Sequence, residues 1–133
     1  MKGNYAETRE HVEYEIGMFR WAINNLRQFA PSPLHDVVLE SFAVHARNLI
    51  NYFYGGSGND DILANDFIPD WETIRPPITP VLSEAKSKAN KQLSHLSYSR
   101  LNKYSGSNKS WDISGIARDL GILIDLFEAN LTC

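Results

Sequence analysis

The sequence predicts an all-α protein, an antiparallel four-helix bundle with a long irregular connection between the second and third helices. In four separate stretches, apolar residues recur every three or four positions, the spacing that places side chains on one face of a helix. Prolines and glycines separate these stretches, and no segment alternates apolar and polar residues for long enough to indicate a strand. The composition, 43% hydrophobic and 22% charged, is typical of a folded protein, and residues 1–133 are expected to form a single domain.

The first helix is expected from about residue 7 to residue 29. Its apolar stripe consists of Val12, Ile16, Phe19, Ile23 and Leu26. The helix should end before Pro31, because a residue that precedes proline is pushed out of the helical conformation. Ser32 and Pro33 then provide a capping residue and a favourable first residue for the second helix.

The second helix should end at Gly55 and Gly56, since glycine readily adopts the left-handed conformation that follows a helix. Its apolar stripe consists of Val38, Phe42, Ala46, Leu49 and Phe53. The connection from residue 55 to residue 78 is rich in Gly, Asn, Asp and Pro and is expected to be mostly irregular, with a short helical turn at 60–65. Its apolar residues predict that it folds back over the helices: Ile62, Leu63, Phe67, Ile68 and Trp71.

Thr79 and Pro80 repeat the capping pattern and start the third helix. Its apolar stripe consists of Leu82, Ala85, Ala89, Leu93 and Leu96, and Lys86, Lys88 and Lys91 are expected on its exposed side. A polar loop follows at 97–109, and Ser110 is expected to cap the fourth helix. The apolar residues of that helix are Ile113, Ile116, Leu120, Leu123 and Phe127.

Charge and cysteine content narrow the classes of partner. Thirteen basic and sixteen acidic residues give a net charge of −3, which argues against binding DNA or an anionic membrane through bulk charge. Any site for an anion must therefore be a local patch. The only cysteine, Cys133, allows no intramolecular disulfide, and no apolar signal segment or membrane span is seen, so a cytoplasmic protein is expected.

The sequence predicts neither a cofactor nor a metal site. None of the four histidines has a glutamate three residues before it, the pattern that di-iron bundles require. The acidic segment 59–70 lacks the ligand spacing of a calcium loop, and no phosphate-binding loop or zinc-protease motif occurs.

A polar stripe adjoins the apolar face of the second helix. It consists of Ser41, His45, Asn48 and Tyr52, at positions i, i+4, i+7 and i+11, with Arg47 and Asn51 beside it. Two interpretations remain open for these side chains. They form a hydrogen-bonded seam between packed helices, because buried polar groups need partners, or they line a polar cleft for a small molecule.

The third helix carries a second polar face, formed by Lys88, Lys91, Gln92 and His95, because seven residues span nearly two helical turns. A lysine pair beside an imidazole can bind a phosphate and exchange a proton near neutral pH. The alternative is a solvated basic face with a packed histidine near the end of the helix.

Residues Ala89-Asn90-Lys91-Gln92-Leu93-Ser94-His95 resemble the Arg-Asn-x-x-x-His segment of HEPN domains, small helical bundles of prokaryotic toxin–antitoxin and phage-defence systems. Asn90 and His95 match the motif, whereas Ala89 stands at the position of the arginine. In that family the motif, usually paired across a homodimer, cleaves RNA without metal through attack of the 2′-hydroxyl on the adjacent phosphate. Lys88 or Arg47 would have to replace the arginine, although lysine does not reproduce the bidentate grip of a guanidinium on phosphate.

The resemblance implies a HEPN-like domain that binds or cleaves RNA, with a homodimer as the assembly. His95, Arg47 and Asn90 would then be the catalytic residues, with His95 transferring protons. The RNA contacts would be Lys88, Lys91 and Gln92. The alternative is a non-catalytic interaction or dimerisation module, in which Trp71, Tyr98, Tyr104 and Trp111 either form the partner surface or pack in the core.

Overall fold

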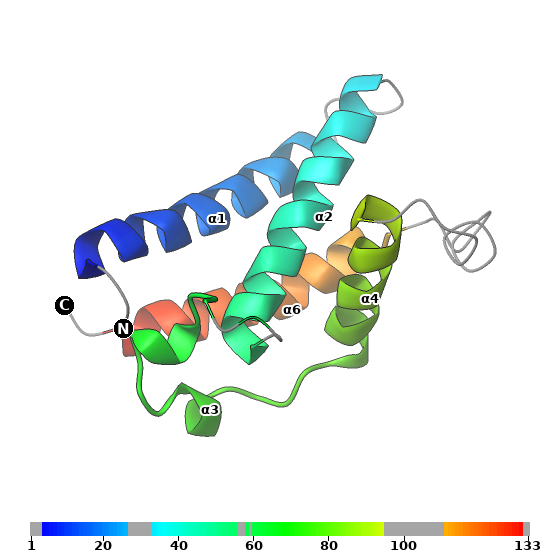
Figure 1. Cartoon of the computed structure of the whole chain (residues 1–133). Helices are drawn as coiled ribbons and strands as arrows, with labels where there is room; N and C mark the ends of the chain where they lie inside the picture. The colour runs from blue at the N-terminus through cyan, green and yellow to red at the C-terminus, as the bar shows by residue number, and fades with distance from the viewer. Residues whose placement is uncertain (1–3, 27–32, 56–57, 59, 95–110, 132–133) are drawn as a thin grey trace.

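The computed structural model describes residues 4–26, 33–55, 58, 60–94 and 111–131, without the side chains of residues 92–94. All regular secondary structure in this part of the chain is helical, which confirms the all-α class (Figure 1). The long helices are α1 (Tyr5–Leu26), α2 (Pro33–Tyr54), α4 (Pro80–Ser94) and α6 (Ile113–Asn130). Two short elements, the 3-10 turn η1 (Ala64–Asp66) and the helix α3 (Trp71–Ile74), lie in the connection between α2 and α4.

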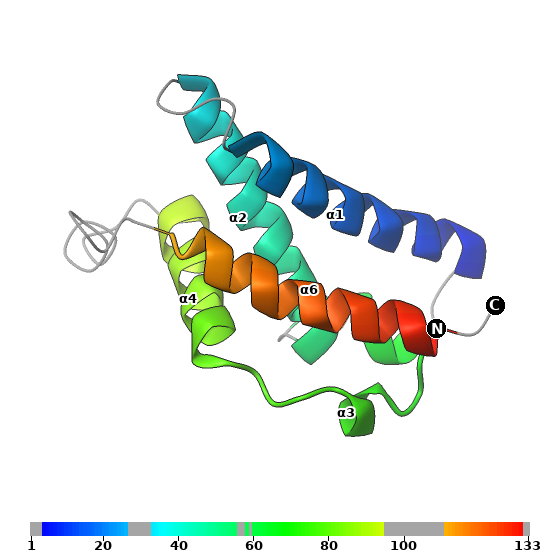
Figure 2. The ribbon, with the colours of Figure 1, turned by 180° about the vertical axis from the view of Figure 1, so that it is seen from behind.

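The central element is α2, which packs against α1, α4, α6 and η1. In Figures 1 and 2, α1 and α6 run in nearly opposite directions, and α2 lies oblique to both of them. Successive long helices pack on each other, α1 on α2, α2 on α4 and α4 on α6. None of the described helices is long and apolar enough to cross a membrane.

Local signals at the helix ends explain where the elements begin. The predicted starts at Pro33 and Pro80 are confirmed, and Thr79 Oγ1 accepts a hydrogen bond from the Leu82 N–H at 3.2 Å. Gly55 follows α2 with a φ of +86°, the left-handed conformation that glycine adopts without strain. The expected cap at Ser110 is wrong, because α6 begins at Ile113 and its N-cap is Asp112, whose Oδ1 accepts the Gly115 N–H at 3.0 Å.

The first helix begins at Tyr5, slightly earlier than expected, because Asn4 caps it. The Asn4 side-chain oxygen accepts hydrogen bonds from the backbone N–H groups of Ala6 and Glu7, at 2.8 and 3.2 Å. The final residues of the expected helix, 27–29, lie outside the described part of the chain.

The predicted apolar stripes form the core. Their described members are buried or partly buried, and Phe19 stacks on Phe42 with ring centroids 5.4 Å apart. A second aromatic group joins the end of α2, the connection and α6: Tyr52, Phe53, Phe67, Trp71 and Phe127. Leu93 and Leu96 of the predicted third stripe fall outside the described side chains.

The connection folds back over the helices as predicted. Its 3-10 turn η1 overlaps only the end of the helical turn expected at 60–65, and α3 lies further along the connection. Trp71 is 1% exposed, and its indole N–H donates to the Phe53 carbonyl at 2.8 Å. Arg75 donates to the same carbonyl at 2.6 Å. The assignment of Trp71 to a partner surface is therefore wrong, because this side chain anchors the connection in the core. Trp111 also packs against the core. Tyr98 and Tyr104 lie outside the described residues.

Candidate functional site

One carboxylate of α1 satisfies two polar side chains of α2. Glu15 Oε2 lies 2.5 Å from His45 Nδ1, and Glu15 Oε1 accepts a hydrogen bond from the Asn48 amide at 3.1 Å. His45 is 9% exposed, and the Tyr14 ring packs edge-on against it at 5.7 Å. His45 and Asn48 therefore contribute to a seam between helices, as one of the two interpretations of the polar stripe requires.

Sequence reasoning does not identify Glu15 as the partner of this stripe. The signal that was available is its position directly beside Ile16 and four residues after His11, at the edge of the apolar face of α1. A carboxylate at that edge meets whatever polar group the neighbouring helix presents.

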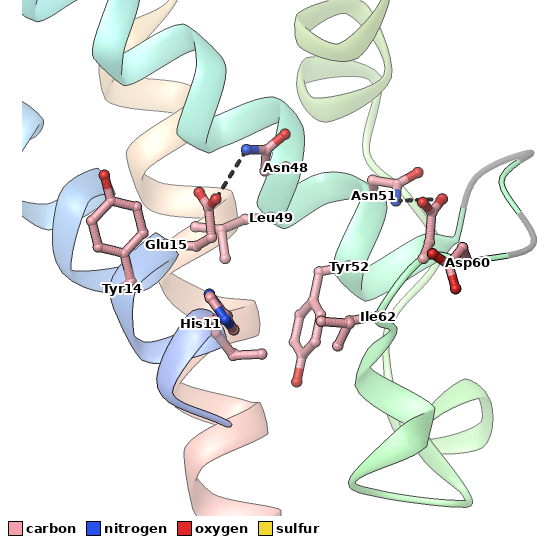
Figure 3. Close-up of a pocket in the computed structure, with 11 residues that line it drawn as sticks. His11, Tyr14, Glu15, Asn48, Leu49, Asn51, Tyr52, Asp60 and Ile62 are labelled. Carbon is pink, nitrogen blue, oxygen red and sulfur yellow. Dashed lines mark hydrogen bonds between the residues drawn. The ribbon is translucent and has the colours of Figure 1, made fainter. Parts of the chain in front are cut away.

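A cavity of about 390 Å³ opens beside this seam, between α1, α2 and the start of the connection (Figure 3). Its wall consists of His11, Val12, Tyr14, Glu15, Asn48, Leu49, Asn51, Tyr52, Asp60, Asp61 and Ile62. The Asn51 amide donates to Asp61 Oδ2 at 3.2 Å. Asn48 and Tyr52 of the predicted stripe thus reach a hollow as well as the seam, whereas Ser41, which is partly buried, is not among the residues that line it.

Tyr52 contributes a buried hydroxyl to this region. The residue is 6% exposed, and its hydroxyl has no hydrogen-bond partner among the described residues. Burial, reinforced by the nearby charge of Asp66, raises the pKa of Tyr52, so the hydroxyl stays protonated and remains a potential donor.

A second hollow, of about 430 Å³, lies between α2 and α4. This groove is lined by Arg47, Asn48, Asn51, Gly58, Asp61, Lys86 and Asn90. Arg47 and Asn90, predicted as site residues from two different helices, therefore share one hollow. Lys86 joins them although sequence reasoning had not placed it in the site, and it also donates to the Gly55 carbonyl at 3.4 Å.

The groove and the cavity are neighbours, because Asn48, Asn51 and Asp61 line both of them. Their charges differ. The groove has the cations Arg47 and Lys86 against the single carboxylate of Asp61, whereas three carboxylates line the cavity, with neither lysine nor arginine in its wall.

Lys88 does not lie on the exposed basic face expected from the sequence. It is 7% exposed, and its Nζ lies 5.3 Å from the centroid of the Trp111 ring. Burial lowers the pKa of Lys88, against a smaller opposing influence of Glu84. Lys91 is partly buried, while the Gln92 side chain and His95 lie outside the described residues.

Ala89, which stands at the arginine position of the HEPN motif, is 1% exposed and packs in the protein interior. Its neighbour Asn90 is exposed and reaches the groove. An arginine at position 89 would have to leave the core to contact a ligand. The guanidinium in this groove comes from α2 instead, through Arg47.

Within the described ranges, no group of three or more His, Cys, Asp or Glu side chains could hold a metal ion.

The chain matches no protein-family model, no curated protein and no solved structure.

Proposed function

We propose that this protein is a HEPN-like domain that binds RNA in the groove between α2 and α4. The observation that supports this most strongly is that Arg47 of α2, together with Lys86 and Asn90 of α4, lines one hollow. A guanidinium grips a phosphate through two parallel hydrogen bonds, a lysine adds a point charge, and an amide donates a further hydrogen bond.

The overall charge makes a localised site necessary. With a net charge of −3, the chain does not attract a polyanion through its whole surface. The groove, with two cations and one carboxylate in its wall, is a locally positive site on a chain whose net charge is negative. The backbone of single-stranded RNA can follow such a groove. DNA is not the expected partner.

The proposal extends to metal-independent cleavage. His95, the residue that follows α4 in the sequence, would accept the proton of the RNA 2′-hydroxyl. The 2′-oxygen then bonds to the adjacent phosphorus, the bond from phosphorus to the 5′-oxygen breaks, and the leaving oxygen takes up a proton from water. Arg47 would stabilise the charge on the phosphate and Asn90 would orient it, while Lys91 and Gln92 would contact the flanking RNA. Lys88 has no direct contact in this scheme, because it lies beneath Trp111.

The accompanying architecture would be an antiparallel four-helix bundle in the cytoplasm, linked to prokaryotic toxin–antitoxin or defence systems. The successive packing of α1, α2, α4 and α6 supports such a bundle. The local motif resemblance supports the biological setting.

A homodimerisation module is the second candidate, and exposed apolar side chains favour it. On α1, Tyr14 and Trp21 are 57% and 47% exposed and lie seven residues apart, on one face. At the start of α2, Leu34 and Val37 are 58% and 62% exposed. Sedimentation of the wild type and of a Trp21→Glu variant tests this; a dimer that Trp21→Glu dissociates supports the module, and a monomeric wild type contradicts it.

Purified protein incubated with single-stranded and structured RNA, without added metal, tests the RNA proposal. We expect binding by the wild type and by His95→Ala, with cleavage by the wild type alone, because His95 would move protons rather than hold the RNA. Binding without cleavage would restrict the function to RNA binding. If neither occurs at micromolar protein, the RNA function is wrong.

A further inference from the structure

We propose that Asn48 is the residue that distinguishes RNA from DNA in the groove between α2 and α4, and that Glu15 positions the Asn48 amide for this purpose. The side-chain oxygen of Asn48 accepts a hydrogen bond from a ribose 2′-hydroxyl of the bound strand. The inference rests on the proposed RNA function and deepens it, because it assigns recognition of the substrate's sugar to one side chain.

The Asn48 side chain has one end bonded within the protein and the other end in the groove. It lines the groove together with Arg47, Lys86 and Asn90. Its amide N–H donates to Glu15 Oε1 at 3.1 Å, and Glu15 lies on α1, outside the wall of the groove. Figure 3 shows the Asn48 nitrogen directed toward Glu15 and the oxygen on the opposite side of the amide. The oxygen, which accepts hydrogen bonds, is therefore the end that a ligand in the groove meets.

The charge of Glu15 fixes the orientation of this amide. If the amide were turned over, the Asn48 oxygen would face the carboxylate, and two acceptors repel each other. The carboxylate is itself held, because its other oxygen is hydrogen-bonded to His45, which is 9% exposed. Asn51 also donates to a carboxylate, that of Asp61, but Asp61 is exposed and restrains its partner less.

An amide oxygen beside two cations determines which ligand chemistry fits. Arg47 and Lys86 attract a phosphate, whereas the Asn48 oxygen repels phosphate oxygens and needs a donor. In the sugar–phosphate backbone of a nucleic acid, the phosphates only accept hydrogen bonds, and the ribose 2′-hydroxyl is the donor. Deoxyribose within a strand has none, so this contact favours RNA over DNA.

The hydroxyl that Asn48 holds differs from the hydroxyl that reacts in the proposed cleavage. A hydroxyl has a single proton, so a 2′-hydroxyl that donates to Asn48 does not give its proton to His95 at the same time. Asn48 therefore contacts the sugar of a nucleotide next to the one that is cleaved. Its contribution is to binding and to the choice of nucleic acid, and Glu15 is a positioning residue that acts through Asn48.

The test measures the affinity of the His95→Ala protein, which is expected to bind without cleaving, for short single strands of one sequence. The strands are RNA, DNA and a series of RNAs with a 2′-fluoro group at each position in turn. Fluorine keeps the ribose-like conformation of the sugar but cannot donate a hydrogen bond. We expect one position at which fluorine weakens binding by about three- to tenfold, the loss of one hydrogen bond, and we expect DNA to bind more weakly than RNA.

Asn48→Ala in the same background should abolish this preference, so that RNA and the sensitive fluorinated strand bind equally, because the acceptor is gone. Asn90→Ala is the matched control, since it removes the same kind of amide from α4 in the same groove. It should weaken the binding of both strands alike and leave the ratio of their affinities unchanged.

The same ratio tests Glu15. Glu15→Ala should reduce it, because the Asn48 amide can then turn and present its nitrogen to the groove. Glu15→Gln keeps an oxygen that can accept from Asn48 and should restore part of the ratio. Since both affinities are measured on one protein sample, a fraction of unfolded variant cancels from the ratio, whereas a purely structural role of Glu15 would leave the ratio unchanged.

The outcomes separate this inference from the proposed function. RNA binding that no single fluorine weakens, or DNA binding as tight as RNA binding, overturns the role of Asn48 and leaves the groove as a phosphate site. A preference that survives Asn48→Ala, or that Asn90→Ala removes equally, also overturns it. An unchanged ratio in Glu15→Ala overturns the positioning role. Absence of binding to every strand rejects the proposed function and this inference with it.

Discussion

Glu15 is a single side chain on which two others depend. It accepts hydrogen bonds from both His45 and Asn48, and His45 is almost fully buried. We predict that Glu15→Ala lowers the free energy of unfolding by about 1–3 kcal/mol, because a buried polar group loses its partner. Denaturant titration measures the effect.

Glu13→Ala is the matched control for Glu15, since it removes the same group from the same helix at a position where the carboxylate is exposed and forms a surface pair with Arg9. This control should change stability little. If the two substitutions have equal effects, the Glu15 seam does not contribute to stability as proposed.

Asp119 links α6 to the start of α4 and confers a pH dependence. Burial alone raises its pKa, but hydrogen bonds from Thr79 and Arg118 and the charge of Arg118 outweigh burial, so the pKa of Asp119 is lower than its ordinary value of 3.8. A depressed pKa contributes stability above the unfolded-state pKa, and this contribution is lost as the pH falls through the folded-state pKa.

We therefore predict that Asp119→Asn destabilises the protein near neutral pH, and that this destabilisation shrinks as the pH falls below 3.8 and through the lowered folded-state pKa, where the wild-type carboxylate is also protonated. Urea unfolding of both proteins across this range gives the difference. A destabilisation that does not shrink at acidic pH would show that packing, rather than the charge of Asp119, accounts for it.

For individual residues, the sequence predicted which polar side chains share a helix face, but not which side chains of other helices they contact. The stripe with His45 and Asn48 was identifiable from helical spacing, whereas Glu15 was not, because the rotation of α1 against α2 decides which faces touch. Lys88 illustrates the same limit: its spacing places it with Lys91, yet Trp111 from a distant segment covers it.

Among the elements, the connection between α2 and α4 depends most on one residue. Trp71 fills the core and donates to the Phe53 carbonyl near the end of α2. We predict that Trp71→Ala costs about 3–5 kcal/mol through lost burial and an unfilled cavity. Trp71→Phe should cost less, since it keeps most of the apolar surface and loses the hydrogen bond.

Trp21, which is 47% exposed on α1, is the control for these substitutions, and Trp21→Ala should change stability by less than about 0.5 kcal/mol. Thermal or urea unfolding of the three variants ranks them. Equal effects of Trp71→Ala and Trp21→Ala would mean that the connection is not anchored in the core.

Element boundaries were predictable where local chemistry determines them. Proline after a capping residue starts α4, and Gly55 follows α2, because these preferences require no distant contact. The start of α6 was predicted wrongly because two candidate caps, Ser110 and Asp112, stand close together in the sequence. The carboxylate of Asp112 is the observed cap, and its negative charge also interacts favourably with the positive end of the helix. The turn η1 overlaps only the end of the turn predicted at 60–65, and the buried Phe67 and Ile68 follow it directly.

At the scale of the whole molecule, a chain with a net charge of −3 concentrates opposite charges in two neighbouring hollows. The fold brings Arg47 and Asn90 together although forty-three positions separate them in the sequence, 90 minus 47. Helical periodicity predicted the class of the fold, because the apolar stripes form the core. It could not predict this convergence, which depends on how α2 and α4 pack.

The salt dependence of RNA binding tests the central claim, that the groove between α2 and α4 holds RNA phosphates, most directly. Each cation that contacts a phosphate releases counterions, so Arg47→Ala and Lys86→Ala should each weaken binding and reduce the slope of log affinity against log salt by about one unit. Arg20→Ala, a substitution on α1 that breaks a surface pair with Glu128, should leave the slope unchanged. Equal slopes for the wild type, Arg47→Ala and Lys86→Ala would contradict the claim.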